Sequence, residues 1–205
     1  MTRVIPPDAF DEAVQALRRG QLVVFPTDTV YGVAALAENA EAVARIYAAK
    51  NRPRHMAIPV MVAEPDRVTD AARPLPGFWA LADAFWPGPL TIILPKTEAL
   101  PPIVAAGGDT VALRIPDHPL ALALLRAVDR PLAVTSANLS GQPPTLTAEE
   151  ARDQLEGRVA IIVDGGRAPG GQPSTILDLT SEPLKILRPG PITWPQIAEA
   201  LKMTR

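Results

Sequence analysis

The chain has 205 residues, of which 47% are hydrophobic and 20% charged, a balance typical of an ordinary globular protein. Its formal net charge of -2 gives no global electrostatic argument for binding nucleic acid or membranes, although a local basic groove is compatible with it. The absence of cysteine excludes disulfides, thiolate zinc sites and cysteine nucleophiles. With neither a signal-peptide pattern nor an apolar run of the ~18 residues that span a bilayer, we expect a cytoplasmic protein without membrane contact.

Apolar periodicity predicts alternating helices and strands. Phe10, Val14 and Leu17 share one face and indicate a first helix. Asp8 is its expected N-cap, and Gly20 is expected to end it. The expected elements after it are strand 22–25, helix 38–49, strand 58–62, helical segments 65–72 and 77–85, strands 90–94 and 111–115, helix 118–128, strands 132–135, 159–163, 176–179 and 184–187, and helix 194–202. This order predicts an α/β fold with a twisted open mixed sheet and flanking helices, formed by residues 1–205 as a single domain.

Short polar motifs stand where apolar strands should end. They are residues 26–32 (PTDTVYG), 50–53 (KNRP), 136–141 (SANLSG), 173–176 (PSTI) and 188–190 (RPG). Ligand sites in α/β proteins form in crevices outside the carboxyl ends of strands, where several loops converge. The hydroxyls and cations of these motifs suit a ligand with phosphates and a second polar substrate.

Each motif also has a purely structural interpretation. Residues 26–32 could form a turn that caps a strand, or Thr29 could donate a hydrogen bond to a small substrate. Lys50 and Arg52 could complement a helix dipole, or they could hold a polyphosphate and stabilise a pyrophosphate leaving group. Ser136 and Ser174 could be turn or cap residues as well as ligand contacts.

Arg114 interrupts an apolar strand, and a partly buried arginine needs an anionic partner. That partner is either an acidic side chain of the protein or the carboxylate of a substrate, and we favour the substrate. His55 and His118 show no metal-ligand spacing. The sequence signatures of P-loop NTPases, dinucleotide-binding proteins and α/β-hydrolases are absent.

The motifs become specific when they are taken together. In chain order they read PTDTVYG, KxRP, WPGPLT, RxPDHP, SANLSG, PSTI and RPG. This series, over about residues 4–191, resembles the YrdC-like family of threonylcarbamoyl-AMP synthases. The resemblance implies a concave basic groove on the sheet and no C-terminal extension domain. It also implies a nucleotidyltransferase that converts L-threonine, bicarbonate and ATP into threonylcarbamoyl-AMP and pyrophosphate, for the modification of an adenosine in tRNA.

The resemblance also implies site residues. The residues expected to bind threonine are Thr29, Arg114, Val134 and Ser174. Those expected to contact ATP are Lys50, Arg52, Thr110, Ser136, Asn138, Pro144 and Arg188. We expect Lys50 and Arg52 to be the catalytic pair, Mg²⁺ to bridge the phosphates of ATP without a metal site in the protein, and a tRNA-modifying transferase complex to act downstream.

Two positions depart from the family pattern. Met56 and Met61 stand where many members carry Asn and His, which could alter the choice of substrate. One alternative is therefore a paralogous carbamoyl-adenylate enzyme with another acceptor. A second is a non-catalytic protein that binds RNA in the groove; the low aromatic content, 4%, counts against binding of single strands by base stacking.

Overall fold

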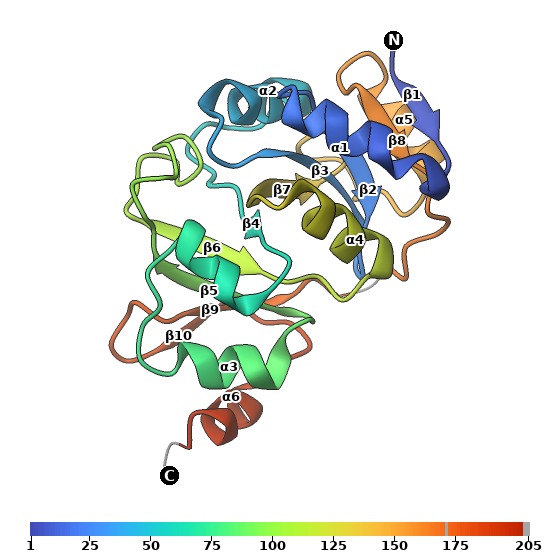
Figure 1. Cartoon of the computed structure of the whole chain (residues 1–205). Helices are drawn as coiled ribbons and strands as arrows, with labels where there is room; N and C mark the ends of the chain where they lie inside the picture. The colour runs from blue at the N-terminus through green and yellow to red at the C-terminus, as the bar shows by residue number, and fades with distance from the viewer. Residues whose placement is uncertain (171, 203–205) are drawn as a thin grey trace.

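The computed structural model describes residues 1–170 and 172–202. Within them, ten strands form one sheet in the order β1-β8-β2-β3-β7-β4-β6-β5-β9-β10 (Figure 1). The strands are β1 (Arg3–Ile5), β2 (Val23–Pro26), β3 (Tyr31–Leu36), β4 (Val60–Met61), β5 (Leu90–Pro95), β6 (Thr110–Arg114), β7 (Leu132–Ser136), β8 (Ile161–Val163), β9 (Thr175–Asp178) and β10 (Lys185–Arg188). The helices are α1 (Phe10–Arg18), α2 (Ala40–Lys50), α3 (Phe78–Phe85), α4 (Pro119–Val128), α5 (Ala148–Leu155) and α6 (Trp194–Ala200), with 3-10 turns η1 (Pro7–Ala9) and η2 (Pro65–Asp70).

The sheet is mixed, as the sequence predicts. Parallel pairs join β1 to β8, β8 to β2, β4 to β6 and β5 to β9. Antiparallel pairs join β2 to β3, β3 to β7, β7 to β4, β6 to β5 and β9 to β10. Because residues opposite one another in paired strands point to the same face, these registers assign every strand residue to one of two faces.

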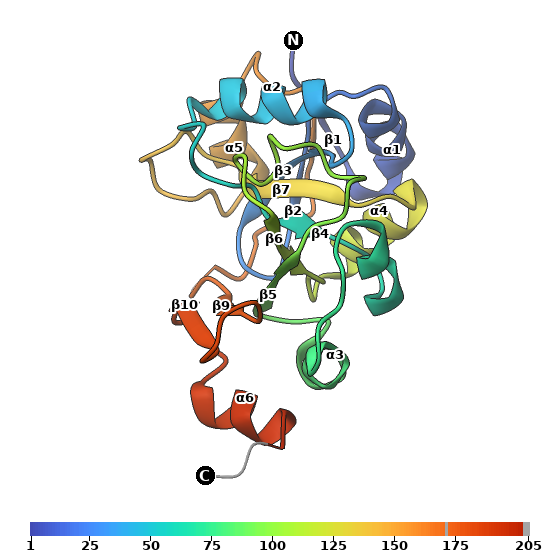
Figure 2. The ribbon, with the colours of Figure 1, turned by 90° about the vertical axis from the view of Figure 1, so that its left-hand side faces the viewer.

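One face of the sheet is covered by α1 and α4, which pack against each other (Figures 1 and 2). Phe25, Ala34 and Val134 point to this face and are buried with residues of both helices. We call it the α1/α4 face. Further along the sheet the same face is more open, because Thr110 is exposed and Ile93 and Ala112 are only half-buried.

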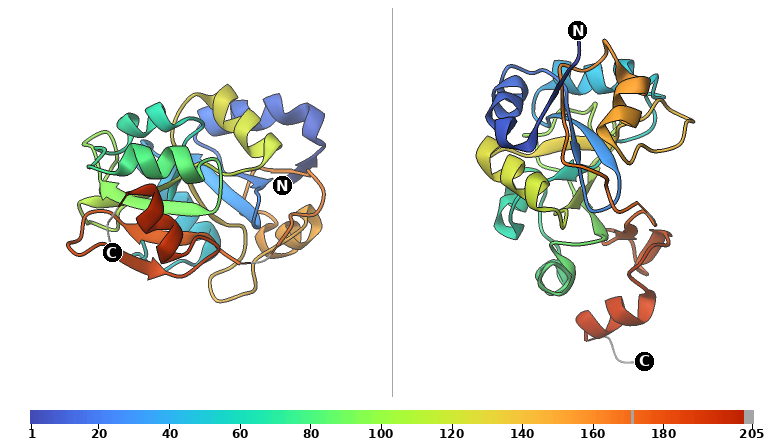
Figure 3. Two further views of the ribbon diagram at one scale, coloured as in Figure 1. Left: turned by 90° about the horizontal axis from the view of Figure 1, so that it is seen from below. Right: turned by 90° about the vertical axis from the view of Figure 1, so that its right-hand side faces the viewer.

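The opposite face carries the larger core. Val33, Ala133 and Leu113 point to it and are fully buried together with side chains of α2, α3, α5 and α6. The C-terminal helix α6 packs with α3 at the end of the molecule far from the N-terminal strand, as Figure 2 and both panels of Figure 3 show. None of the helices in the described residues is both long enough and apolar enough to cross a membrane.

The structure corrects several predicted elements. Strands β1 and β3 and helix α5 were not expected; β3 is missed because its motif was interpreted as a loop through Gly32. Asp8 does not cap the first helix, which begins at Phe10 after Ala9, because Asp8 lies in a 3-10 turn. The predicted helical segment 65–72 is also a 3-10 turn, Pro65–Asp70. His118, by contrast, is the N-cap of α4.

Candidate functional site

Lys50 is the last residue of α2, and its side chain turns inward toward the end of β7. The helix ends there because Asn51 adopts a left-handed conformation, with φ of +52°. The Lys50 side chain is 1% exposed, and Nζ donates to the backbone carbonyls of Ser136 and Asn138. Burial, reinforced by the nearby charge of Arg52, lowers the pKa of Lys50 to about 8. The lysine is therefore a buried cation held by carbonyl dipoles.

A cavity of about 430 Å³ opens beside Lys50. Arg52 forms part of its wall, where Nε donates to the carbonyl of Met56 at 3.1 Å and Nη2 donates to that of Ala57 at 2.8 Å. The residues lining the cavity are Lys50, Asn51, Arg52, Pro53, Met56, Ser136, Asn138, Ser140 and Gly141. Two cations, hydroxyls and amide groups in one cavity provide donors suited to an anionic ligand.

The turn between β2 and β3 presents Thr29. Buried Thr27 organises this turn, because its Oγ1 donates to the carbonyl of Val30 at 2.7 Å and accepts from the backbone N–H of Thr29 at 3.2 Å. The two threonine hydroxyls lie 3.1 Å apart. The structural interpretation of this motif as a side-chain-stabilised turn is thus correct, and it leaves Thr29 half-buried at the turn.

Arg114 finds its anionic partner inside the protein. It is 5% exposed, forms a salt bridge with Asp28 through Nη2, and donates from Nε to the carbonyl of Gly88 at 2.9 Å. A substrate carboxylate is therefore not required to neutralise Arg114, and the expected contact of Arg114 with a substrate carboxylate stays a prediction. One oxygen of Asp28, Oδ1, is buried and has no hydrogen-bond partner among the described residues.

Ser174 lies just before β9 and is 3% exposed. Its Oγ is 2.7 Å from Oγ1 of Thr91, which is also 3% exposed. Arg188 donates from Nη2 to the Ser174 hydroxyl at 3.1 Å and from Nε to the Ser174 carbonyl at 3.1 Å. Burial lowers the pKa of Arg114, and the charge of Arg188 contributes to that shift.

The predicted residues separate into two groups along β6. Thr110 and Arg114 stand at its two ends and point to the α1/α4 face, about 13 Å apart at ~3.3 Å per residue. Thr91 and Ser174 lie near the Arg114 end, because β5 runs antiparallel to β6 and parallel to β9. The parallel pairing of β4 with β6 places Ala57, which binds Arg52, toward the Thr110 end.

Three of the residues predicted to contact ligands lie in surroundings that do not by themselves support the predicted contact. Arg188, expected near ATP, lies instead with Ser174. Pro144 is exposed and does not line the Lys50 cavity. Val134 is 3% exposed and packs in the core of the α1/α4 face. The predicted ligand roles of these three residues remain predictions.

Sequence reasoning assigned no role to Asp28 or Thr91. Asp28 lies inside the first motif, between Thr27 and Thr29, and its position there gives no sign of a distant partner. Thr91 carries a clearer signal, because it is a polar residue in an otherwise apolar strand segment, 90–94. A hydroxyl in that position must find a partner when it is buried, and this requirement could have identified it.

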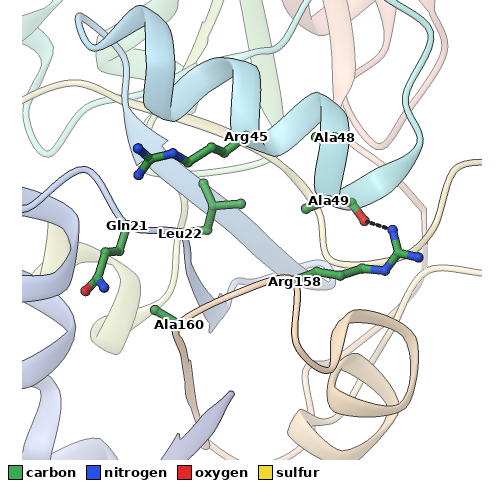
Figure 4. A pocket seen from close by; sticks show the side chains of 7 residues that line it. All are labelled: Gln21, Leu22, Arg45, Ala48, Ala49, Arg158 and Ala160. Atoms are coloured by element: carbon green, nitrogen blue, oxygen red, sulfur yellow. Dashed lines mark hydrogen bonds between the residues drawn. The ribbon is translucent and has the colours of Figure 1, made fainter. Parts of the chain in front are cut away.

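A second cavity, of about 400 Å³, lies on another side of α2 (Figure 4). Its two arginines belong to different segments and point away from each other. Arg45 donates to the carbonyl of Gly20 at 2.9 Å, and Arg158 donates to that of Ala49 at 3.2 Å. Their guanidinium groups thus bind backbone carbonyls and do not point toward a common ligand position. We therefore place the candidate site at the Lys50 cavity and at the Arg114 cluster, by which we mean Asp28, Thr91, Arg114, Ser174 and Arg188.

Comparisons with known proteins agree with the predicted family. The family model Sua5_yciO_yrdC, described as telomere recombination, matches residues 15–190. A threonylcarbamoyl-AMP synthase of Bacillus subtilis is 48% identical over 188 residues, covering 91% of this chain and 54% of the relative. A putative threonylcarbamoyl-AMP synthase of Mycobacterium tuberculosis is 44% identical over 190 residues, covering 92% and 87%.

The fold agrees as well. The crystal structure of Pyrococcus abyssi Sua5 complexed with L-threonine superposes with a TM-score of 0.91 at 38% identity, covering 98% of this chain and 60% of that one. The chain spans about half the length of the Bacillus relative. Sequence and structure lead to the same result: this chain belongs to the Sua5/YciO/YrdC family.

Proposed function

We propose that the chain is an L-threonylcarbamoyladenylate synthase, which forms threonylcarbamoyl-AMP and pyrophosphate from L-threonine, bicarbonate and ATP. Relatives that share 41% and 48% identity with it carry the name threonylcarbamoyl-AMP synthase. The observation that carries the proposal is the arrangement along β6. A cationic cavity lies toward one end of the strand, and a cluster of arginines and hydroxyls lies at the other. An elongated ligand with phosphates at one end and an amino-acid carboxylate at the other fits this arrangement.

The Lys50 cavity is the proposed ATP end. Lys50 and Arg52 hold the phosphates and stabilise the charge that develops on departing pyrophosphate. Ser136, the last residue of β7, supplies a hydroxyl contact, and Asn138, in the loop that follows, supplies an amide contact. Thr110, Pro144 and Arg188 complete the proposed nucleotide contacts.

The Arg114 cluster is the proposed threonine end. Arg114 keeps N–H groups beyond those that bind Asp28 and Gly88, and these donate to the threonine carboxylate. Thr29 and Ser174 provide hydroxyls nearby, and Val134 is the fourth proposed contact. The Pyrococcus abyssi Sua5 structure is a complex with L-threonine, which supports an amino acid as substrate here.

The chemistry requires positioning more than covalent help from the protein. The amine of threonine adds to bicarbonate with loss of water and gives a carbamate. An oxygen of the carbamate then forms a bond to the α-phosphorus of ATP, and the bond from that phosphorus to pyrophosphate breaks. We assign no general base.

Mg²⁺ is the proposed cofactor, carried by the phosphates of ATP. Among residues 1–170 and 172–202, no three His, Cys, Asp or Glu side chains gather into a metal site. The donors at Lys50 and Arg52 are cationic, so they suit phosphate oxygens and not the metal. When bound, Mg²⁺ would neutralise phosphate charge.

We further propose that the product is consumed in the cytoplasm by a tRNA-modifying transferase complex. Any RNA contact would lie in a basic groove on the open part of the α1/α4 face.

Pyrophosphate release tests the proposal. The protein is incubated with ATP, Mg²⁺ and bicarbonate, with and without L-threonine, and with serine and alanine as controls. Release that depends on both threonine and bicarbonate is the expected result. Release with another acceptor would indicate a paralogue, and Met56 and Met61 would then be the first residues to exchange. A protein that binds RNA but not ATP, with an affinity that falls steeply with salt, would overturn the enzyme assignment.

A further inference from the structure

The hydroxyls of Ser174 and Thr91 form a hydrogen-bonded pair that leaves one hydroxyl proton without an acceptor among the described residues. A serine hydroxyl has one proton to donate and two lone pairs that accept. Two groups of the described residues lie within hydrogen-bond distance of Ser174 Oγ: Thr91 Oγ1 at 2.7 Å and Arg188 Nη2 at 3.1 Å. Since a guanidinium group only donates, the bond from Arg188 occupies one lone pair of Ser174.

The bond between Thr91 and Ser174 uses one of the two hydroxyl protons, and either hydroxyl can be its donor. Thr91 is 3% exposed, and within the described part of the chain Ser174 Oγ is the only acceptor within hydrogen-bond distance of its hydroxyl. Ser174 is also 3% exposed, and the described residues offer its hydroxyl no other acceptor, so one of the two buried protons lacks a protein partner whichever hydroxyl donates. Under the proposed function Ser174 is the group that contacts the substrate, and Thr91 then donates to it. Both lone pairs of Ser174 are then occupied, and the Ser174 proton is left for a group outside the protein.

The surroundings indicate what accepts this proton. The register of β5 on β6 puts Ile92 opposite Leu113, so Thr91 lies opposite Arg114. Arg188 also lies close enough to act on the pKa of Arg114. A free O–H donor beside two guanidinium groups, only one of which has a carboxylate partner among the described residues, favours an anionic acceptor.

We propose that Thr91 is a positioning residue which, together with Arg188, makes the Ser174 hydroxyl an obligatory donor to the carboxylate of the amino-acid substrate. This inference rests on the proposed function and adds to it a residue outside the predicted set. Thr91 does not touch the substrate. It acts by occupying a lone pair of Ser174, so that the Ser174 proton cannot turn away from the substrate.

The test compares Thr91→Val, which keeps the shape of the side chain and removes the hydroxyl, with Thr91→Ser, which keeps the hydroxyl. Thr69→Val, an exposed threonine in η2, is the matched control. We expect Thr91→Val to raise the KM for L-threonine about tenfold, with the KM for ATP and kcat within about twofold of wild type. Thr91→Ser should restore the threonine KM to within about threefold.

A double variant decides whether Thr91 acts through Ser174. In a Ser174→Ala background, Thr91→Val should have little further effect on the threonine KM, because the hydroxyl it positions is gone. Additive effects, an unchanged KM in Thr91→Val, or equal losses in Thr91→Val and Thr91→Ser would each overturn the proposal. Direct measurement of L-threonine binding to each folded variant distinguishes an effect on substrate affinity from an effect on turnover. A wild-type protein that binds L-threonine without releasing pyrophosphate contradicts the proposed function alone, whereas one that binds none contradicts both.

Discussion

Lys50 and Arg114 are both buried cations, 1% and 5% exposed, but the protein compensates their charges differently. Arg114 has a carboxylate, that of Asp28, and one backbone carbonyl. Lys50 has only the carbonyls of Ser136 and Asn138, and no carboxylate of the described residues lies within salt-bridge distance of it. Carbonyl dipoles solvate a charge without cancelling it, so the Lys50 cavity keeps a net positive charge and the Arg114 cluster is closer to neutral.

The difference explains how one site can handle two unlike substrates. A positive cavity lined by cations attracts a polyphosphate through charge itself. A neutralised arginine selects by the directions of its remaining N–H groups, which suits a small carboxylate held in one orientation. We therefore expect changes at Lys50 to affect ATP and changes at Arg114 to affect threonine.

Lys50→Met is expected to have the largest effect on catalysis. It removes the charge and keeps a linear side chain of similar length, so the departing pyrophosphate loses a preorganised partner. We expect kcat/KM for ATP to fall by about 10²–10³-fold, the usual loss for one such group. Pyrophosphate release measures the effect, and thermal unfolding checks that the variant is folded.

Lys185→Met is the matched control, because Lys185 is an exposed lysine on β10. It should retain wild-type activity. If the ATP parameters of Lys50→Met equalled those of the control, Lys50 would be a structural residue that only joins α2 to the end of β7. The contrast with Arg114 would then have no functional meaning.

Asp28→Asn tests the neutralisation of Arg114 by removing the charge of its carboxylate partner. It leaves Arg114 buried without a counter-charge, and breaking a buried pair on one side costs about 3 kcal/mol of unfolding free energy. Chemical denaturation of the single variant, of Arg114→Met and of the double variant measures the coupling between the two residues. Asp83→Asn, on the exposed side of α3, should change the free energy by less than about 0.5 kcal/mol. Additive effects of Asp28→Asn and Arg114→Met would show that the pair contributes nothing.

Arg114→Lys keeps the charge and removes the planar fork. We expect it to weaken threonine binding by about 1–3 kcal/mol, or roughly 5–150-fold, because an ammonium group cannot serve Asp28, Gly88 and a carboxylate in one plane. The KM for ATP should stay within about twofold. An unchanged KM for threonine would remove Arg114 from the proposed threonine end.

Much of this arrangement could be predicted from the sequence. Apolar periodicity located most strands and helices, and His118 was the N-cap of the expected helix. The missed elements have physical reasons. Tyr31 and Gly32 begin β3 although they belong to a motif that has the composition of a turn, and α5 is a polar helix whose small inward residues, Ala148 and Ala151, give a weak apolar pattern.

The site was predictable by residue type but not by partner. Lys50, Arg52, Ser136 and Asn138 were expected together, and they line one cavity. The pairing of Arg114 with Asp28 joins residues 86 positions apart in the chain, and local pattern carries no information on such a contact. For that reason two partners were open for Arg114 from sequence alone, and the internal one is present.

The smallest expected effect is a pH dependence of ATP binding, which we expect to arise from the Lys50 cavity and not from the Arg114 cluster. Burial lowers the pKa of Lys50 to about 8, so the free protein carries this charge below that pH and loses it above. A bound polyphosphate favours the charged form, so ATP binding should take up protons near pH 8.5 and weaken about threefold between pH 7.5 and 8.5. Calorimetry in buffers of different ionisation enthalpy measures the proton uptake. Lys50→Met should abolish it, whereas Arg114→Lys should leave it intact. Equal proton uptake in wild type and Lys50→Met would assign the titration to another group and remove the electrostatic distinction between the two ends of the site.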